Sequence, residues 1–103
     1  MIVPFKVFYA SEVYEDLQNA IDFYNSRRKG LGTQFYKTVK NQISHIKLNA
    51  YGFQLRYDDV RCMPLNKFPY TIHYKIYPDT KTIKIVAIFS DYLNPEIWDG
   101  RLE

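Results

Sequence analysis

The spacing of hydrophobic and polar residues changes along the chain from the period of a strand to that of a helix and back. Residues 2–9 are short and rich in β-branched and aromatic side chains, which predicts a strand. Pro4 is typical of an edge strand, because proline cannot donate to a neighbouring strand. From residue 11 onward the apolar residues recur three and four positions apart, so a helix is expected to follow the strand.

Two helices joined by a tight turn are predicted over residues 11–48. Ser11 is expected to cap the first helix, and the cations at residues 27–29 suit its C-terminal end. Gly30 permits the left-handed conformation that often terminates a helix. The second helix then begins at Leu31 or Gly32, and the pair forms a helical hairpin.

Three strands and a short helix are predicted after a polar loop at residues 49–59. The expected strands are Val60–Leu65, Tyr70–Tyr77 and Thr82–Phe89. The second half of the last strand is apolar on both faces, which suits a central position in a sheet. Asn94, Pro95 and Glu96 form a typical helix start before Trp98.

The element order β-α-α-β-β-β predicts an α+β fold with a helical hairpin on one face of a sheet. The sheet is expected to be four-stranded and mainly antiparallel, with its opposite face partly open and available for a site. At 103 residues, with no linker or repeat, the chain is expected to be a single domain over residues 1–103.

Cysteine content and hydropathy indicate the compartment. The one cysteine, Cys62, lies in a predicted strand, and a buried thiol without a disulfide partner is typical of a reducing compartment. No segment has the roughly 20 apolar residues of a membrane span, and the N-terminus lacks the pattern of a secretory signal. We therefore expect a cytoplasmic protein that does not engage a membrane.

Positive charge is concentrated in the middle of the chain. The net charge is +3, but residues 27–61 carry eight basic residues against Asp58 and Asp59, a net +6. Such a segment is either a solvated helix surface or a surface for an anionic partner, nucleic acid or acidic protein.

Familiar catalytic motifs are missing from the sequence. His45 and His73 have no cysteine or carboxylate at metal-ligand spacing, so no metal and no cofactor are predicted. The glycines do not form a phosphate-binding loop, and Ser90 lacks the glycine elbow of a serine nucleophile. His45 is expected at the surface or boundary of the second helix. His73 is expected to look out from the open side of the sheet, and a structural or incidental role is favoured for it over a functional one.

A set of basic residues on or near the sheet remains as a nucleic-acid or partner surface. Its members are Arg56, Arg61, Lys67 and Lys75, interleaved with the tyrosines Tyr57, Tyr70, Tyr74, Tyr77 and Tyr92. Arginine binds phosphate through two parallel hydrogen bonds and tyrosine stacks on bases. For Arg61 an ion pair with Asp58, Asp59 or Asp91 is the alternative.

Three segments in order carry a family resemblance. They are "DLQNAIDFYNSRRKGLGTQFY" at residues 16–36, "VRCMPLNKFPYTIHYKI" at 60–76 and "IKIVAIFSDYLNPEIWDGR" at 83–101. Together they span nearly the whole chain, which resembles the RelE/ParE superfamily of bacterial type II toxin–antitoxin toxins. The resemblance implies the β-α-α-β-β-β fold already predicted and a partner antitoxin whose C-terminal segment wraps the toxin.

Two modes of action are implied by this family. RelE-like members cut mRNA on the ribosome with a basic cluster, whereas ParE-like members inhibit DNA gyrase by binding. Many relatives have a histidine after the last strand, where this chain has Ser90, followed by Asp91, Tyr92 and Leu93. Because residues 90–94 contain no histidine, lysine or arginine, and an aspartate there also repels phosphate, we favour a ParE-like toxin that acts by protein binding, inhibits growth and serves in plasmid stabilization.

Two alternatives stay open. In the first alternative, the chain is a RelE-like, metal-independent endoribonuclease with an atypical site. That site is built from Arg56, Arg61, Lys67, His73 and Tyr92. In that case Arg61, His73 and Tyr92 are the catalytic candidates, with Tyr92 or His73 replacing the family histidine. The other alternative is a non-toxic binding module that keeps the fold, and a homodimer is compatible with all three.

Overall fold

The computed structural model describes residues 4–92. Its elements are β1 (Lys6–Tyr9), α1 (Ser11–Arg27), α2 (Leu31–Leu48), the 3-10 turn η1 (Ala50–Gly52), β2 (Gln54–Tyr57), β3 (Val60–Pro64), β4 (Tyr70–Tyr77), the 3-10 turn η2 (Pro78–Thr80) and β5 (Thr82–Ser90). The predicted hairpin and the three later strands are confirmed. The predicted C-terminal helix falls on residues 94–98, outside the described residues.

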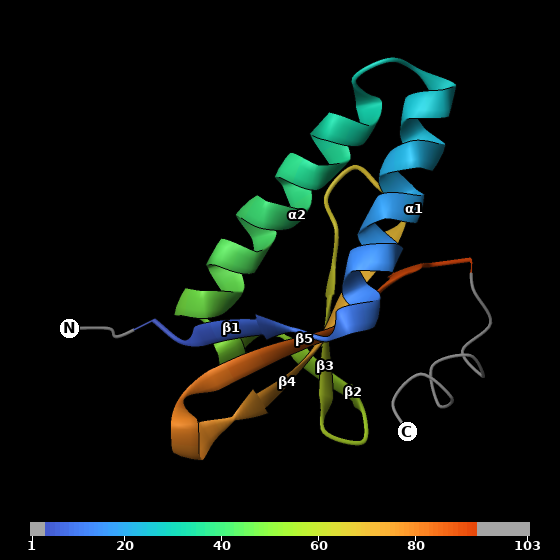
Figure 1. Cartoon of the computed structure of the whole chain (residues 1–103). Coiled ribbons are helices and arrows are strands. Elements are labelled where there is room, and N and C mark those ends of the chain that lie inside the picture. The colour runs from blue at the N-terminus through green and yellow to red at the C-terminus, as the bar shows by residue number, and fades with distance from the viewer. Residues whose placement is uncertain (1–3, 93–103) are drawn as a thin grey trace.

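The molecule has two layers, a helical hairpin and a sheet (Figure 1). The strand order is β1-β5-β4-β3-β2, with β1 parallel to β5 and the other neighbours antiparallel. Strand β1 lies at an edge, as Pro4 suggested, and β5 lies between β1 and β4, as its apolar sequence predicted. The α+β class is confirmed.

The predicted four strands are wrong in number, because the sheet has five. Strand β2 lies within residues 49–59, which the sequence analysis treated as a loop. Its side chains are mostly exposed, so it lacks the apolar run by which the other strands were found. Asp58 adopts the left-handed conformation at φ 46° and closes a tight β2–β3 turn, a role that aspartate tolerates.

The helix ends agree with the prediction at the turn but not at the start. Gly30 has φ 85°, the left-handed conformation predicted for it. The residue that caps α1 is Ala10, whereas Ser11 lies in the first turn and its hydroxyl donates to Glu12 Oε1 at 2.8 Å. Ser11 is therefore not the N-cap, because its hydroxyl is used by a neighbouring carboxylate.

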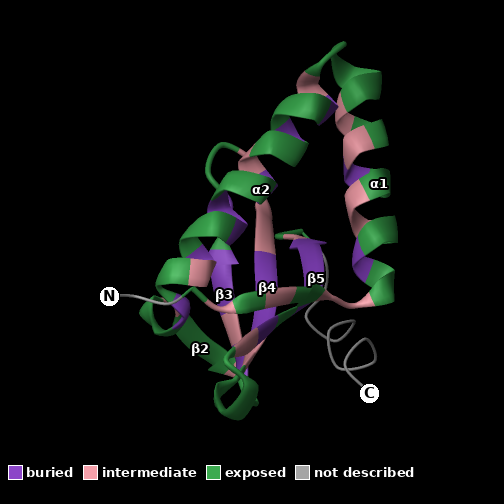
Figure 2. Ribbon diagram, turned by 60° about the vertical axis from the view of Figure 1, so that its left-hand side comes forward, coloured by how far each residue is buried: buried purple, intermediate pink, exposed green. Residues whose placement is uncertain are grey.

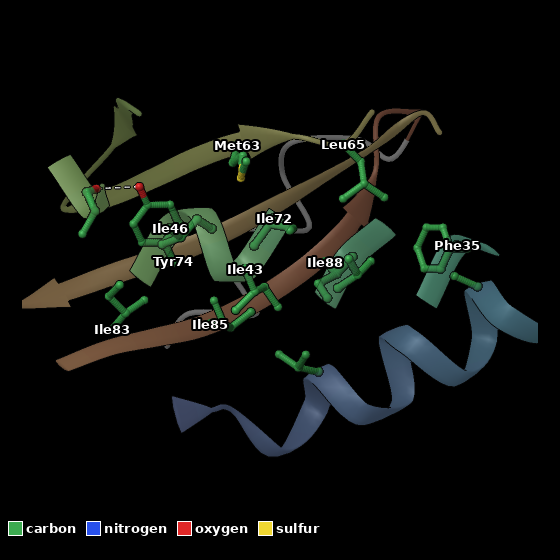
Figure 3. Packing of buried hydrophobic residues seen from close by; sticks show 14 residues of the cluster. Phe35, Ile43, Ile46, Met63, Leu65, Ile72, Tyr74, Ile83, Ile85 and Ile88 are labelled. Atoms are coloured by element: carbon green, nitrogen blue, oxygen red, sulfur yellow. Dashed lines mark hydrogen bonds between the residues drawn. The ribbon is translucent and has the colours of Figure 1, made fainter. Parts of the chain in front are cut away.

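The core lies between the hairpin and the sheet (Figure 3). Helix α2 contributes the largest apolar stripe, and β4 and β5 meet it with isoleucines and Tyr74. The stripe residues are Phe35, Val39, Ile43 and Ile46, all buried. The Tyr74 hydroxyl donates to the Ala50 carbonyl at 2.6 Å, so the one polar group of this ring is satisfied inside the core.

An irregularity in β5 changes which of its side chains face the helices. The register moves from Tyr74 opposite Ile85 to His73 opposite Ala87, which leaves Val86 without an opposing residue on β4. Ile85 and Ile88 consequently both face the helices, whereas Val86 joins a second cluster on the other face. Burial is accordingly deepest in the centre of β3, β4 and β5 (Figure 2).

The helices approach each other closely at Gly32, which leads to a test of the packing. A Cβ at Gly32 would meet the Ile21 carbonyl oxygen and the Asn25 side chain, which accepts a bond from the Gly32 N–H at 2.8 Å. We expect Gly32→Ala to lower the free energy of unfolding by about 1–3 kcal/mol in urea denaturation, despite alanine's higher helix propensity.

Gly30→Asn provides the matched control. Nothing lies within 4 Å of a Cβ at Gly30, and asparagine tolerates the left-handed conformation. Its free energy of unfolding should fall by less than that of Gly32→Ala, because the change adds only the strain of the left-handed conformation and no clash. Equal losses in the two variants would contradict the close approach at Gly32.

Candidate functional site

The sheet face turned away from the helices, which we call the outer face, is closed over its centre. Val60, Cys62 and Val86 form a buried cluster there, with Tyr57 packed against it. His73 lies in the middle of β4 and is 0% exposed. The prediction that this face is partly open and that His73 looks out from it is therefore wrong.

His73 is enclosed by groups from three strands. Its Nδ1 is hydrogen-bonded to the Tyr57 hydroxyl of β2 at 2.8 Å and lies 3.4 Å from the Cys62 sulfur of β3. The Phe89 ring of β5 packs edge-on against the imidazole at 5.2 Å. Tyr57 reaches His73 because β2 pairs with β3, and the mostly exposed side chains of β2 give the sequence no sign of this strand.

Burial keeps the outer-face cluster uncharged at neutral pH. It lowers the pKa of His73 from 6.5 to about 4, an effect that the Arg56 guanidinium increases and Asp91 partly opposes. It also raises the pKa of the Cys62 thiol from 9.0 to about 11. The cluster thus offers neither an imidazolium for a phosphate nor a thiolate nucleophile.

The cations nearest this cluster are at its rim. Arg56 is exposed on β2. Lys75 Nζ lies 3.4 Å from Asp59 Oδ1, and this carboxylate neutralises part of its field. Lys84 of β5 is exposed and lies opposite Lys75 on the same face. A positive surface on the outer face would therefore depend chiefly on Arg56 and Lys84.

Arg61 lies on the opposite side of the sheet from His73. It stands opposite Tyr74 in the register, and its Nη1 donates to the Phe53 carbonyl at 2.7 Å and the Tyr51 carbonyl at 3.4 Å. Its guanidinium also lies over the Tyr51 ring. Within residues 4–92 it forms none of the predicted ion pairs; instead it joins β3 to the turn after α2.

Lys67 belongs to a third location, a pocket of about 430 Å³ beside α2. His45 lines the same pocket and is exposed, as expected. Lys67 and His45 therefore form a neighbourhood separate from both Arg61 and His73, and spacing along the chain gave no sign that these two residues meet.

The end of β5 carries polar groups that bond to one another. Asp91 accepts a hydrogen bond from the Thr71 hydroxyl at 2.6 Å, and the Ser90 hydroxyl accepts the Tyr92 backbone N–H at 3.2 Å. Tyr92 itself is 86% exposed.

In the described part of the chain no three histidine, cysteine or acidic side chains gather as metal ligands. None of the described helices is long and apolar enough to cross a membrane.

The fold has counterparts of known structure. A chain of the chromosomal ParDE TA (toxin–antitoxin) system from P. aeruginosa matches with a TM-score of 0.73 and 17% identity, over 84% of this chain and 95% of that one. The isolated E. coli RelE toxin matches with a TM-score of 0.63 and 10% identity, over 95% of each chain. A chain of the toxin–antitoxin complex RelBE2 from Mycobacterium tuberculosis matches with a TM-score of 0.57 and 14% identity, over 87% of this chain and 94% of that one.

These comparisons confirm the fold that the family resemblance implied. The chain has the architecture of RelE/ParE toxin structures over nearly its whole length. No protein-family model and no curated protein sequence matches it. At 10–17% identity the likeness establishes the fold, and activity has to be argued from the site.

The buried imidazole predicts a stability that depends on pH. Because the pKa of His73 is about 4 when folded and near 6.5 when unfolded, its contribution is complete above pH 6.5 and is lost as pH falls toward 4. Between pH 8 and pH 5 we expect the loss of this contribution to lower the free energy of unfolding by about 2 kcal/mol. Urea denaturation at both pH values measures the loss.

A variant at this position separates the effect of His73 from that of the other titrating groups. His73→Gln keeps an acceptor for Tyr57 and removes the titrating ring, so its stability should fall much less over the same pH range. The His73 imidazole of the parent protein should also stay neutral in NMR spectra at pH 5. An imidazolium at pH 6 would contradict the buried position.

Proposed function

We propose that the chain is the toxin component of a type II toxin–antitoxin system, of the ParE-like kind. It acts as a single domain in the cytoplasm by binding a protein target, with DNA gyrase the first to test, and a cognate antitoxin neutralises it. The fold shared with the ParDE, RelBE2 and RelE structures supports the toxin assignment. Plasmid stabilization belongs to the same proposal.

The observation that favours binding over RNA cleavage is the dispersal of the candidate catalytic groups. Cleavage of RNA needs an acid, a base and a cation around one phosphate. Here His73 is buried and neutral on the outer face, Arg61 bonds to carbonyls on the helix side, and Lys67 lies beside α2. The pocket that holds both His45 and Lys67 has no carboxylate, tyrosine or second histidine in its lining to supply the third role.

A RelE-like endoribonuclease is the second candidate. It is favoured by the exposure of Arg56 next to the His73 cluster and by the exposure of Tyr92, because both can reach a large substrate. In this alternative Arg56 binds phosphate and Tyr92 stacks on a base or donates a proton. A non-toxic binding module is the third candidate.

Expression of the chain alone in a bacterial host should stop growth without codon-phased cuts in bulk mRNA. A frame-shifted copy of the same gene is the control for the burden of expression. In parallel, the purified chain should inhibit DNA supercoiling by gyrase. Ribosome-dependent cuts that disappear in Arg61→Ala would sink the ParE-like assignment, and normal growth with soluble protein would support the non-toxic module.

The endoribonuclease candidate has its own test in Arg56→Ala and Tyr92→Phe, two changes at exposed positions that should preserve the fold. If binding to a protein is the mode of action, mRNA stays intact in all strains and Tyr92→Phe retains growth arrest. A cleaving site would instead lose about a hundredfold or more in rate when its general acid is removed. Primer extension on mRNA from the induced cultures measures the cuts.

A further inference from the structure

The pocket beside α2 is lined by both polar and apolar side chains. It has a volume of about 430 Å³ and lies between α2 and the loop that joins β3 to β4. Lys67, His45, Asn41 and Asn66 supply polar groups, and Phe53 and Met63 supply apolar ones. Such a mixture suits a ligand with a polar end and an apolar stem.

The walls of this pocket are held by bonds across the interior. Gln42 of α2 is 4% exposed; its Nε2 donates to the Pro64 carbonyl at 2.9 Å, and its Oε1 accepts the Asn66 N–H at 2.6 Å. Beyond the pocket, Phe68 packs against the rings of Tyr24 and Phe35 at 5.0 and 5.2 Å. The β3–β4 loop is thereby held against the hairpin (Figure 1), so the pocket is a built feature.

The charges around the pocket are of one sign. None of its lining residues is acidic, and helix α2 carries Lys37, Lys40 and Lys47 but no aspartate or glutamate. The neighbouring helix α1 has the opposite character, with four carboxylates and a single arginine. Positive potential is thus concentrated on α2 and the β3–β4 loop, while the far side of the hairpin is negative.

Lys67 occupies a conformation that lysine rarely adopts. Its φ is 69°, in the left-handed region where glycine or asparagine fits at lower cost. The chain nevertheless has a lysine there, and its side chain lines the pocket. Lys81 adopts the same conformation outside the pocket, so what distinguishes Lys67 is its place in the pocket lining.

We propose that this pocket binds a glutamate or aspartate side chain from a peptide segment of a protein partner. The carboxylate is held by Lys67 with help from Asn41, Asn66 or His45, and the methylene stem or a neighbouring apolar residue rests on Phe53 and Met63. Charge complementarity selects the acidic residue, and the volume of the pocket accommodates a side chain. The inference applies to whatever protein carries the segment, and so goes beyond the proposed toxin function.

A nucleic acid fits this location less well. A phosphate backbone is recognised by a continuous basic track and by exposed aromatic rings that stack on bases. The pocket is lined by one lysine and no arginine, its aromatic residue Phe53 is half-buried, and the hairpin beyond α2 turns acidic. A single carboxylate matches one lysine, whereas a polyanion would extend onto repelling charge.

The test uses the full chain labelled with ¹⁵N and refolded from inclusion bodies, so that the protein need not be active in the producing cell. The probes are two capped tetrapeptides, Leu-Glu-Leu-Glu and Leu-Gln-Leu-Gln, together with inorganic phosphate and a short single-stranded RNA. NMR titration follows the amide signals of Asn41, Asn66 and Lys67. The acidic peptide should shift them in a saturable manner, and the glutamine peptide should not.

Two variants with the same change of residue and charge locate the interaction. Lys67→Asn keeps the left-handed turn and removes the ammonium, and it should weaken binding of the acidic peptide about tenfold. Lys37→Asn removes the same charge from an exposed position of α2 that does not line the pocket, and it should bind nearly as the parent does.

Each other result would overturn the proposal. No saturable shift with the acidic peptide, or an equal loss in both variants, would mean that the pocket has no carboxylate site. Tighter binding of RNA or phosphate through Lys67 would assign it to phosphate instead. A growth assay does not enter this experiment, so its failure is distinct from a failure of the toxin assignment.

Discussion

Strand β5 is the element on which the rest of the structure depends. It is hydrogen-bonded to β1 on one side and β4 on the other, and its side chains enter both the helix-side core and the outer-face cluster. The Ile88 N–H also donates to Asp16 Oδ2 of α1 at 3.1 Å, which attaches the first helix to the sheet. The segment of β5 from Ile85 to Phe89 has to be apolar, because side chains on both faces of the sheet are buried there.

The same apolar requirement governs what the outer face can do. An imidazole in the centre of a buried sheet is kept neutral, because an imidazolium there would lose its hydration without gaining an equivalent interaction. Its Nδ1 is hydrogen-bonded to Tyr57 instead of to water. The residues that resemble a catalytic set in sequence are thereby separated, with His73 enclosed and Arg61 engaged on the opposite side. Charge available to a partner remains at the rim and on α2.

The helical hairpin separates charge between its two members. Helix α1 is acidic and α2 is basic, yet both contribute apolar stripes to one core, so burial decides the packing and charge is left for the exposed sides. The pocket beside α2 lies on the basic side, where Gln42 and Phe68 hold the β3–β4 loop in place. Fold and surface charge are therefore largely independent in this molecule.

The sequence by itself determined the hairpin, the left-handed Gly30 and the central β5, because each has a local signature in period, glycine or apolar run. It did not reveal β2, whose exposed side chains and single neighbouring strand leave no such signature. Only the tertiary structure decided that His73 is buried, that Arg61 bonds to the Tyr51 and Phe53 carbonyls, and that Lys67 and His45 share a pocket. The physical reason is that each of these depends on which strand lies beside which and on where a register shift falls, and neither is encoded in nearby residues.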